Sequence, residues 1–124
     1  MIRVLLVDDD VTLVGIWQEG LASLGFDVMT AYNGNEAMNI LMAGEFDVLV
    51  TDMYMNNGGG QQLISWSREN KPSLKILAVS GEKLDHILSA LDIVEDDGIP
   101  TLEKPFEIRQ LADVINGMSN NQFF

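Results

Sequence analysis

The sequence predicts an α/β fold in which helices cover both faces of a parallel β-sheet. Short apolar segments alternate five times along the chain with longer segments whose apolar residues recur at helical spacing. This is the pattern of consecutive β-α units. No internal repeat or low-complexity linker interrupts the alternation. Because 124 residues are the usual size of one domain, we expect a single core and right-handed crossovers.

The first half of the chain contains two strand–helix units. Residues 2–7 are almost continuously apolar, as a strand buried on both faces should be. In residues 11–24 the apolar side chains follow helical spacing, and Gly25 is a typical helix stop. Residues 26–31 are the second predicted strand. A turn of asparagine and glycine then starts a second helix, which residues 42–44 close.

The second half continues the alternation through three more units. Residues 56–60 are a glycine-rich loop, and a proline within residues 71–73 separates a helix from the next strand. Near the end of the chain, Ile108, Leu111 and Ile115 share one helical face. The predicted elements are strand 47–51, helix 61–70, strand 74–79, a helix within 83–94, a short strand near Thr101 and a last helix that ends near Gly117.

The composition excludes several classes of protein. The chain has no cysteine, which excludes a disulfide scaffold and a cysteine-ligated metal site. No apolar stretch approaches the length of a membrane span and no signal-peptide pattern is present, so we expect a cytoplasmic protein without a membrane partner. Seven basic and nineteen acidic residues give a formal charge of -12. This charge would repel phosphate backbones and argues against direct nucleic-acid binding.

Most of the predicted strands end at polar or charged side chains. Asp8 and Asp9 follow the first strand, Asp52 follows the third, Ser80 the fourth, and Lys104 the last. The carboxyl ends of neighbouring parallel strands meet at one edge of a sheet, where such folds bind ligands. Three close carboxylates repel one another unless a cation lies between them. We therefore predict a site for Mg²⁺ or Mn²⁺, which prefer oxygen ligands.

This set of side chains is suited to phosphoryl transfer. Asp52 is the best-placed nucleophile, because a carboxylate can attack a phosphoryl donor and form an aspartyl phosphate. Ser80 can donate a hydrogen bond to a phosphate oxygen, and Lys104 can place a positive charge beside it. Asp10 directly precedes a predicted helix, and we expect it only to cap that helix.

Four motifs carry a resemblance to the receiver domains of two-component response regulators. They are residues 5–10 (LLVDDD), 48–55 (VLVTDMYM), 78–81 (AVSG) and 104–106 (KPF). The resemblance covers essentially the whole chain and implies a flavodoxin-like (βα)5 three-layer sandwich with strand order 2-1-3-4-5. It also implies a receiver domain at residues 1–118, a short C-terminal tail at residues 119–124 and no output domain.

The resemblance implies roles for the acidic residues of the predicted site. Asp52 is similar to the phosphoacceptor, which takes its phosphoryl group from a phosphohistidine. The donor would be a sensor histidine kinase or a histidine phosphotransfer protein. Asp9, Asp52 and the backbone carbonyl of Tyr54 resemble the ligands of the metal ion. Asp8 resembles a second acid of the metal site, which acts mostly through water.

The resemblance implies signalling rather than turnover of a separate substrate. Ser80 is similar to the switch hydroxyl of the family, and Lys104 is similar to the lysine that binds the phosphoryl group. Phosphorylation would change the binding of a downstream effector protein. The domain would assist its own phosphorylation and dephosphorylation without being an enzyme.

The chain departs from the family pattern at three positions. Asn56 stands where proline is usual, and Gly59 stands where an aspartate usually precedes the glycine. Thr101 stands three residues before the lysine, where the family usually has an aromatic residue. Because Thr101 is too small to act as an aromatic toggle, we expect conformational change to centre on residues 80–83 and 56–60.

Two other interpretations stay open at this point. Residues 8–12 (DDDVT) fit the Asp-x-Asp-x-Thr motif of haloacid-dehalogenase-like phosphatases, in which Asp8 would be the nucleophile and Asp10 the general acid/base. That interpretation leaves Asp52 without a role, places Lys104 after the second acidic pair, and leaves no room for a cap domain. The other is a pseudo-receiver, which keeps the fold as a binding module without phosphorylation.

Overall fold

The structure of the 124-residue chain is a computed structural model that describes residues 1–53, 55, 59–81 and 99–119. Its strands are β1 (Arg3–Val7), β2 (Asp27–Ala31), β3 (Val48–Asp52), β4 (Lys75–Ser80) and β5 (Thr101–Glu103). They form one sheet in the order β2-β1-β3-β4-β5, and every neighbouring pair is parallel. This order confirms the flavodoxin-like topology that the sequence implied.

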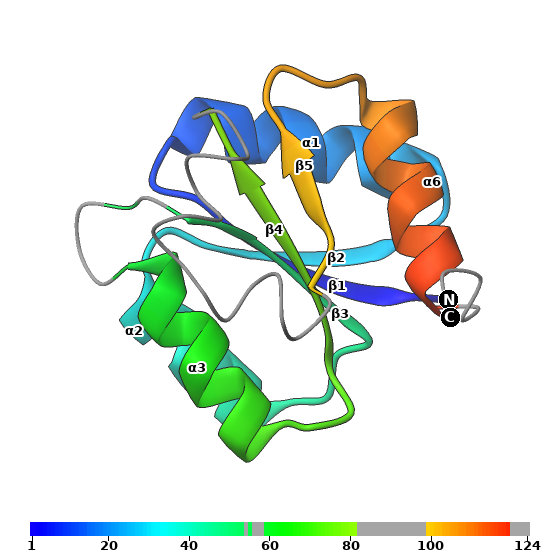
Figure 1. The fold of residues 1–124 in the computed structure, drawn as a ribbon. Helices are drawn as coiled ribbons and strands as arrows, with labels where there is room; N and C mark the ends of the chain where they lie inside the picture. Colours follow the sequence, from blue (N-terminus) through cyan, green and yellow to red (C-terminus); the bar gives the residue numbers. More distant parts are fainter. Residues whose placement is uncertain (54, 56–58, 82–98, 120–124) are drawn as a thin grey trace.

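Helices cover both faces of the sheet (Figure 1). The helices of the described residues are α1 (Val11–Ser23), α2 (Gly34–Ala43), α3 (Gly60–Asn70) and α6 (Ile108–Ser119). α1 and α6 pack on one face and α2 and α3 on the other, which gives the three predicted layers. The helix predicted within residues 83–94 lies outside the described residues.

Side chains alternate along the strands and so build an apolar layer on each face of the sheet. The layer beneath α2 and α3 includes Leu5, Val7, Leu49, Ala78, Leu41 and Leu63. The layer beneath α1 and α6 includes Val4, Leu6, Val50, Val79, Trp17 and Leu111. Because both faces of β1, β3 and β4 are buried, these strands have continuous apolar sequences rather than alternating ones.

Local hydrogen bonds and one glycine set the ends of the first two helices. The Asp10 carboxylate accepts a hydrogen bond from the Leu13 N–H at 3.1 Å, and the Asn33 side chain accepts one from the Glu36 N–H at 2.8 Å. Gly25 has a φ of 95°, the left-handed conformation that favours glycine after a helix. The predicted cap at Asp10 and the predicted stop at Gly25 are both confirmed.

Some element ends differ from the predicted bounds. β3 and β4 each extend one residue further, to Asp52 and Ser80, because both residues are still paired with the neighbouring strand. α6 ends at Ser119 rather than near Gly117, because Met118 packs into the apolar core. The polar residues of the predicted site therefore include the last residues of two strands, whose positions the sheet itself fixes.

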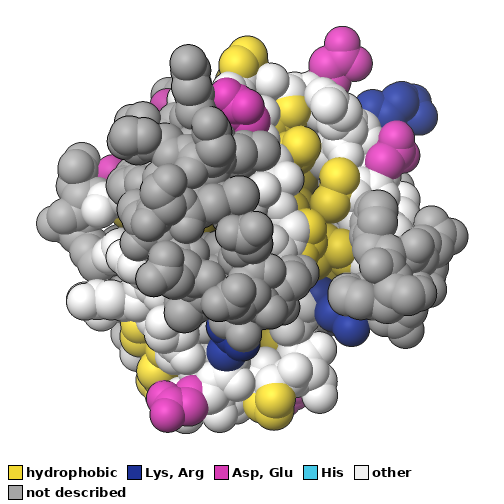
Figure 2. Space-filling model, in the orientation of Figure 1, with side chains coloured by type: hydrophobic (Ala, Val, Ile, Leu, Met, Phe, Trp, Pro, Cys, Tyr) yellow, Lys and Arg dark blue, Asp and Glu magenta, His cyan; other side chains and the backbone are white. Residues whose placement is uncertain are grey.

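β5 is the short edge strand beside β4, and its residues are half-buried or exposed. Figure 2 shows a band of apolar side chains on the surface between β5 and α6. Leu102, Phe106 and Ile108 are half-buried and pack against the layer beneath α1 and α6. This part of the chain therefore connects the edge of the sheet to that layer.

Replacing Asp10 by alanine removes the side-chain cap of α1, so the free energy of unfolding should fall by about 1 kcal/mol. Asparagine accepts the same hydrogen bond, so Asp10→Asn should stay within about 0.3 kcal/mol of the original protein. Urea unfolding measures both values. An equal loss of stability in the two variants would contradict the capping role.

Candidate functional site

The register of the parallel strands brings the predicted site residues to one edge of the sheet. The residue before Asp8 pairs with the residue before Asp52, so these two carboxylates are level at the ends of β1 and β3. The residue before Lys104 pairs with Ser80, so Lys104 lies one step beyond Ser80. The sheet thus brings together side chains that are far apart in the sequence.

Strand alternation determines which layer these side chains face. Asp8 lies two residues after Leu6, and Asp52 lies two residues after Val50. Leu6 and Val50 both belong to the layer beneath α1 and α6, so the two carboxylates continue the series on that face. Lys104 continues β5 in the same way, since the residue two before it packs against this layer. The charged groups therefore meet above the apolar side chains of α1 and α6.

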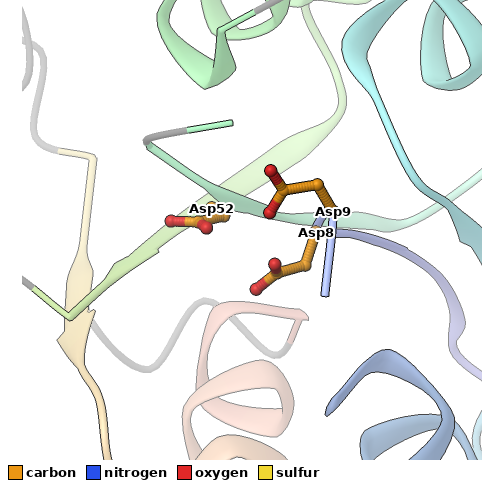
Figure 3. Close-up of side chains that lie close together, drawn as sticks. All are labelled: Asp8, Asp9 and Asp52. Atoms are coloured by element: carbon orange, nitrogen blue, oxygen red, sulfur yellow. The ribbon is translucent and has the colours of Figure 1, made fainter. Parts of the chain in front are cut away.

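Three carboxylates gather at the ends of β1 and β3 (Figure 3). One oxygen from each of Asp8, Asp9 and Asp52 lies within 4.8 Å of the others. Asp8 is 1% exposed and Asp52 is 6% exposed, so little water screens their repulsion. Oxygen donors at this spacing fit Mg²⁺, which is commonly bound through one or two carboxylates and several waters. The structure thus confirms that the three predicted acids lie together, and their donor atoms suit the predicted metal.

Asp8 is held by hydrogen bonds on both sides. Its backbone N–H donates to the Ala31 carbonyl at 3.2 Å, which ties the end of β1 to the end of β2. Its Oδ1 accepts a hydrogen bond from the Asp10 N–H at 3.0 Å, and its Oδ2 accepts one from Lys104 Nζ at 2.8 Å. Both carboxylate oxygens of Asp8 are therefore engaged within the protein.

Lys104 supplies positive charge to the acidic cluster. Its Nζ lies 2.8 Å from Asp8 Oδ2 and 3.4 Å from Asp52 Oδ2. Burial by itself would lower the pKa of Lys104. The hydrogen bond to Asp8 and the charges of Asp52 and Asp8 outweigh burial, so the pKa of Lys104 is raised above its ordinary value. Lys104 is therefore protonated at neutral pH and balances part of the carboxylate charge.

Ser80 fixes the backbone of Lys104. The Lys104 N–H donates to the Ser80 carbonyl at 2.7 Å, and Ser80 is 1% exposed at the end of β4. The peptide bond between Lys104 and Pro105 is cis, a form that is largely confined to bonds before proline. The hydroxyl residue and the ammonium group that the sequence assigned to phosphate binding are therefore neighbours across β4 and β5.

Gly60 lets the start of α3 lie directly against the end of β3. A Cβ atom on Gly60 would collide with the backbone carbonyl oxygen of Asp52 and would lie 3.0 Å from the Met53 Cα. The Met53 N–H donates to the Val79 carbonyl at 3.0 Å, so β4 also holds the chain that follows Asp52. The sequence placed Gly60 at the end of a glycine-rich loop, whereas the structure gives it a steric role beside Asp52.

Some residues named in the sequence analysis lie outside the described part of the chain, and others lie away from the acidic cluster. The backbone carbonyl of Tyr54, a predicted metal ligand, and the side chain of Asn56 lie outside the described residues. Thr101 begins β5 and is half-buried. Trp17 is a core residue of α1, and the centre of its ring lies 5.5 Å from Lys104 Nζ. No local sequence signal indicates this approach, because it depends on how α1 packs against the sheet.

The model of the family described as "Response regulator receiver domain" matches residues 4–116. The chain belongs to this family. It is therefore a receiver domain of two-component systems, a signalling domain rather than a classical enzyme. The match confirms the family that the sequence motifs indicated. It also favours the receiver interpretation over the phosphatase interpretation. In a phosphatase of that kind Asp10 would act in catalysis, whereas in this structure the Asp10 side chain caps α1.

Two relatives and one solved structure illustrate the likeness. The chain is 34% identical over 123 residues to the sensor kinase CckA of Brucella abortus (strain 2308), covering 96% of this chain and 13% of that protein. It is 27% identical over 118 residues to the DNA-binding transcriptional regulator NtrC of Azospirillum brasilense, covering 95% of this chain and 24% of that protein. The response regulator protein TrrA of Thermotoga maritima, solved in complex with Mg²⁺-BeF, is 27% identical with a TM-score of 0.82, covering 94% of this chain and 97% of that one.

The chain spans a small part of these two curated relatives, so the activity of either whole protein does not transfer to it. The expectation that this protein does not bind nucleic acid finds no support among them, because NtrC is named as a DNA-binding regulator. Within the described part of the chain, none of the helices has the length and apolar character needed to cross a bilayer.

Replacing Gly60 by alanine should displace either Asp52 or the start of α3, because the new Cβ would collide with backbone that cannot rotate away. We expect the free energy of unfolding to fall by about 1–3 kcal/mol, the usual range for overpacking. Urea unfolding measures this loss, and a Mg²⁺ titration followed by NMR shifts reports the geometry around Asp52.

Gly59→Ala is the matched control for this substitution. A Cβ on Gly59 would have its nearest neighbour at 3.9 Å, and the φ of Gly59 is -64°, which alanine adopts without strain. Because Gly59 is the N-cap of α3, where alanine is less favourable than glycine, the control should lower the free energy of unfolding by less than about 1 kcal/mol. Equal effects of the two alanines would contradict the steric role of Gly60.

Proposed function

We propose that Asp52 accepts a phosphoryl group from a phosphohistidine donor in a reaction that requires Mg²⁺ or Mn²⁺. The phosphorylated domain would then change its binding to a downstream effector protein. The observation that carries this proposal is the cluster of Asp8, Asp9 and Asp52 with Lys104 against it, within a chain of the receiver family. Such a cluster can hold a cation and can stabilise a phosphoryl group, which are the main requirements of phosphoryl transfer.

Asp52 is a better candidate for the nucleophile than Asp8. Both oxygens of Asp8 accept hydrogen bonds, from the Asp10 N–H and from Lys104, and its side chain is 1% exposed. The side chain of Asp52 is 9% exposed, and its contact with Lys104 Nζ is longer, at 3.4 Å. Hydrogen bonds to a carboxylate stabilise its charge and reduce its tendency to attack phosphorus.

In the proposed transfer, an oxygen of the Asp52 carboxylate attacks the phosphorus atom of the donor. The phosphorus–nitrogen bond breaks, its electron pair stays on the imidazole nitrogen, and that nitrogen takes up a proton. Lys104 would provide positive charge beside the phosphoryl oxygens, and the Ser80 hydroxyl would donate a hydrogen bond to one of them. The domain would in this way assist its own phosphorylation and dephosphorylation.

Asp9 and Asp52 would hold the metal ion, with Asp8 acting mostly through water. The backbone carbonyl of Tyr54 would complete the protein ligands, an assignment that rests on the family resemblance alone. The bound ion would supply charge neutralisation for the phosphoryl oxygens and help to orient them for in-line displacement.

The likeness to a sensor kinase and to a transcriptional regulator supports a histidine kinase or phosphotransfer protein as the donor and a regulated protein as the effector. A cytoplasmic location stays a prediction, as does the domain boundary at residue 118.

Incubation with acetyl phosphate and Mg²⁺ tests the proposal, with mass spectrometry of peptides used to locate the adduct. The adduct should form on Asp52, be lost in Asp52→Asn, and be lost when a chelator removes the metal. Asp10→Asn is the control: it keeps the helix cap, so labelling should be unchanged. An adduct on Asp8, or full labelling of Asp52→Asn at the original site, would overturn the proposal.

A further inference from the structure

The Lys104 ammonium has an aromatic neighbour as well as two carboxylates. The centre of the Trp17 ring lies 5.5 Å from Lys104 Nζ. An ammonium within about 6 Å of an indole ring is attracted by the negative face of the ring. Trp17 is 5% exposed and Lys104 is half-buried, so water screens this contact less than it would at an open surface. The charge of Lys104 is therefore attracted by groups on α1 as well as on β1 and β3.

Trp17 also contacts the chain beyond Lys104. Its ring stacks on the Phe106 ring with the centroids 5.1 Å apart and the planes at 24°. One side chain of α1 thus contacts residues on both sides of Pro105. Three residues along the helix, α1 makes another close approach, since a Cβ on Gly20 would lie 2.6 Å from the Ile108 Cγ1.

We propose that Trp17 is a positioning residue that holds the Lys104 ammonium at the acidic cluster; this inference rests on the function proposed above. A lysine side chain has a flexible stem, and ordering it restricts many rotamers. The indole ring restricts that freedom without accepting a hydrogen bond of its own from Lys104. The N–H groups of Lys104 thus stay directed to Asp8, Asp52 and the phosphoryl group that Asp52 would carry.

Core packing alone makes a different prediction. Trp17 belongs to the apolar layer beneath α1 and α6, so truncating it will lower stability whether or not it acts on Lys104. If Trp17 only packs in the core, substituting it should change the affinity for a phosphate analogue equally with and without Lys104. If Trp17 positions Lys104, the effect of substituting Trp17 should depend on Lys104, and a double-mutant cycle distinguishes the packing role from the positioning role.

The experiment titrates beryllofluoride, a phosphoryl analogue, into the full chain with Mg²⁺ present. Trp17→Leu keeps an apolar side chain but removes the ring, and it should weaken beryllofluoride binding about two- to fivefold, the range that a cation–π contact supplies. Trp17→Phe keeps an aromatic face and should recover most of the affinity. In a Lys104→Met background, Trp17→Leu should have no further effect.

The chain provides a matched control in Trp66, which is half-buried on α3 and packs against the opposite layer. Trp66→Leu should leave the affinity unchanged. A second readout needs no metal: in Trp66→Phe, where Trp17 is the only tryptophan, Lys104→Met should shift the emission of Trp17 by removing the charge beside its ring.

Each outcome is decisive. Three results would each overturn the positioning role and leave the phosphoacceptor proposal intact. The first is unchanged affinity in Trp17→Leu, and the second is a loss of affinity that is equal with and without Lys104. The third is Trp17 emission that does not respond to Lys104→Met. Failure of the original protein to bind beryllofluoride would overturn both. Loss of affinity in Trp17→Leu that vanishes in the Lys104→Met background supports the positioning role.

Discussion

Lys104 makes it possible for two buried carboxylates to lie side by side. Asp8 and Asp52 lie at the ends of neighbouring strands and are 1% and 6% exposed, so without a cation their mutual repulsion would push the strand ends apart. Lys104 Nζ lies 2.8 Å from one and 3.4 Å from the other, and the Lys104 backbone is hydrogen-bonded to Ser80. One residue thereby joins the end of β5 to those of β1, β3 and β4.

Much of this arrangement follows from rules that act locally or along a sheet. Asp10 caps α1 because its side chain reaches an N–H three residues ahead, which the sequence reveals directly. Parallel strands with apolar sequences end at one edge, so the polar residues after them were predicted to meet, and Asp8, Asp9 and Asp52 do. The strand order came from the family resemblance, because apolar patterns alone do not determine which strands are neighbours.

The remaining features depend on packing between elements, which leaves no local signal. Gly60 looks like one more glycine in a flexible loop until the start of α3 is placed against the Asp52 carbonyl. Trp17 occupies an ordinary core position in the helical pattern, and only the packing of α1 against the sheet brings it beside Lys104 and Phe106. The strand ends were predicted one residue short, since the sequence does not show that Asp52 and Ser80 are still paired.

Charge balance explains why a divalent ion and a phosphoryl group would share this site. Three carboxylates against one ammonium leave two negative charges, which one divalent cation neutralises. A phosphoryl group on Asp52 would replace one carboxylate charge with about two, so it would compete with Asp8 for Lys104. Any resulting shift of Lys104 would reach Phe106 through the chain and α1 through Trp17. This route does not require an aromatic side chain at Thr101.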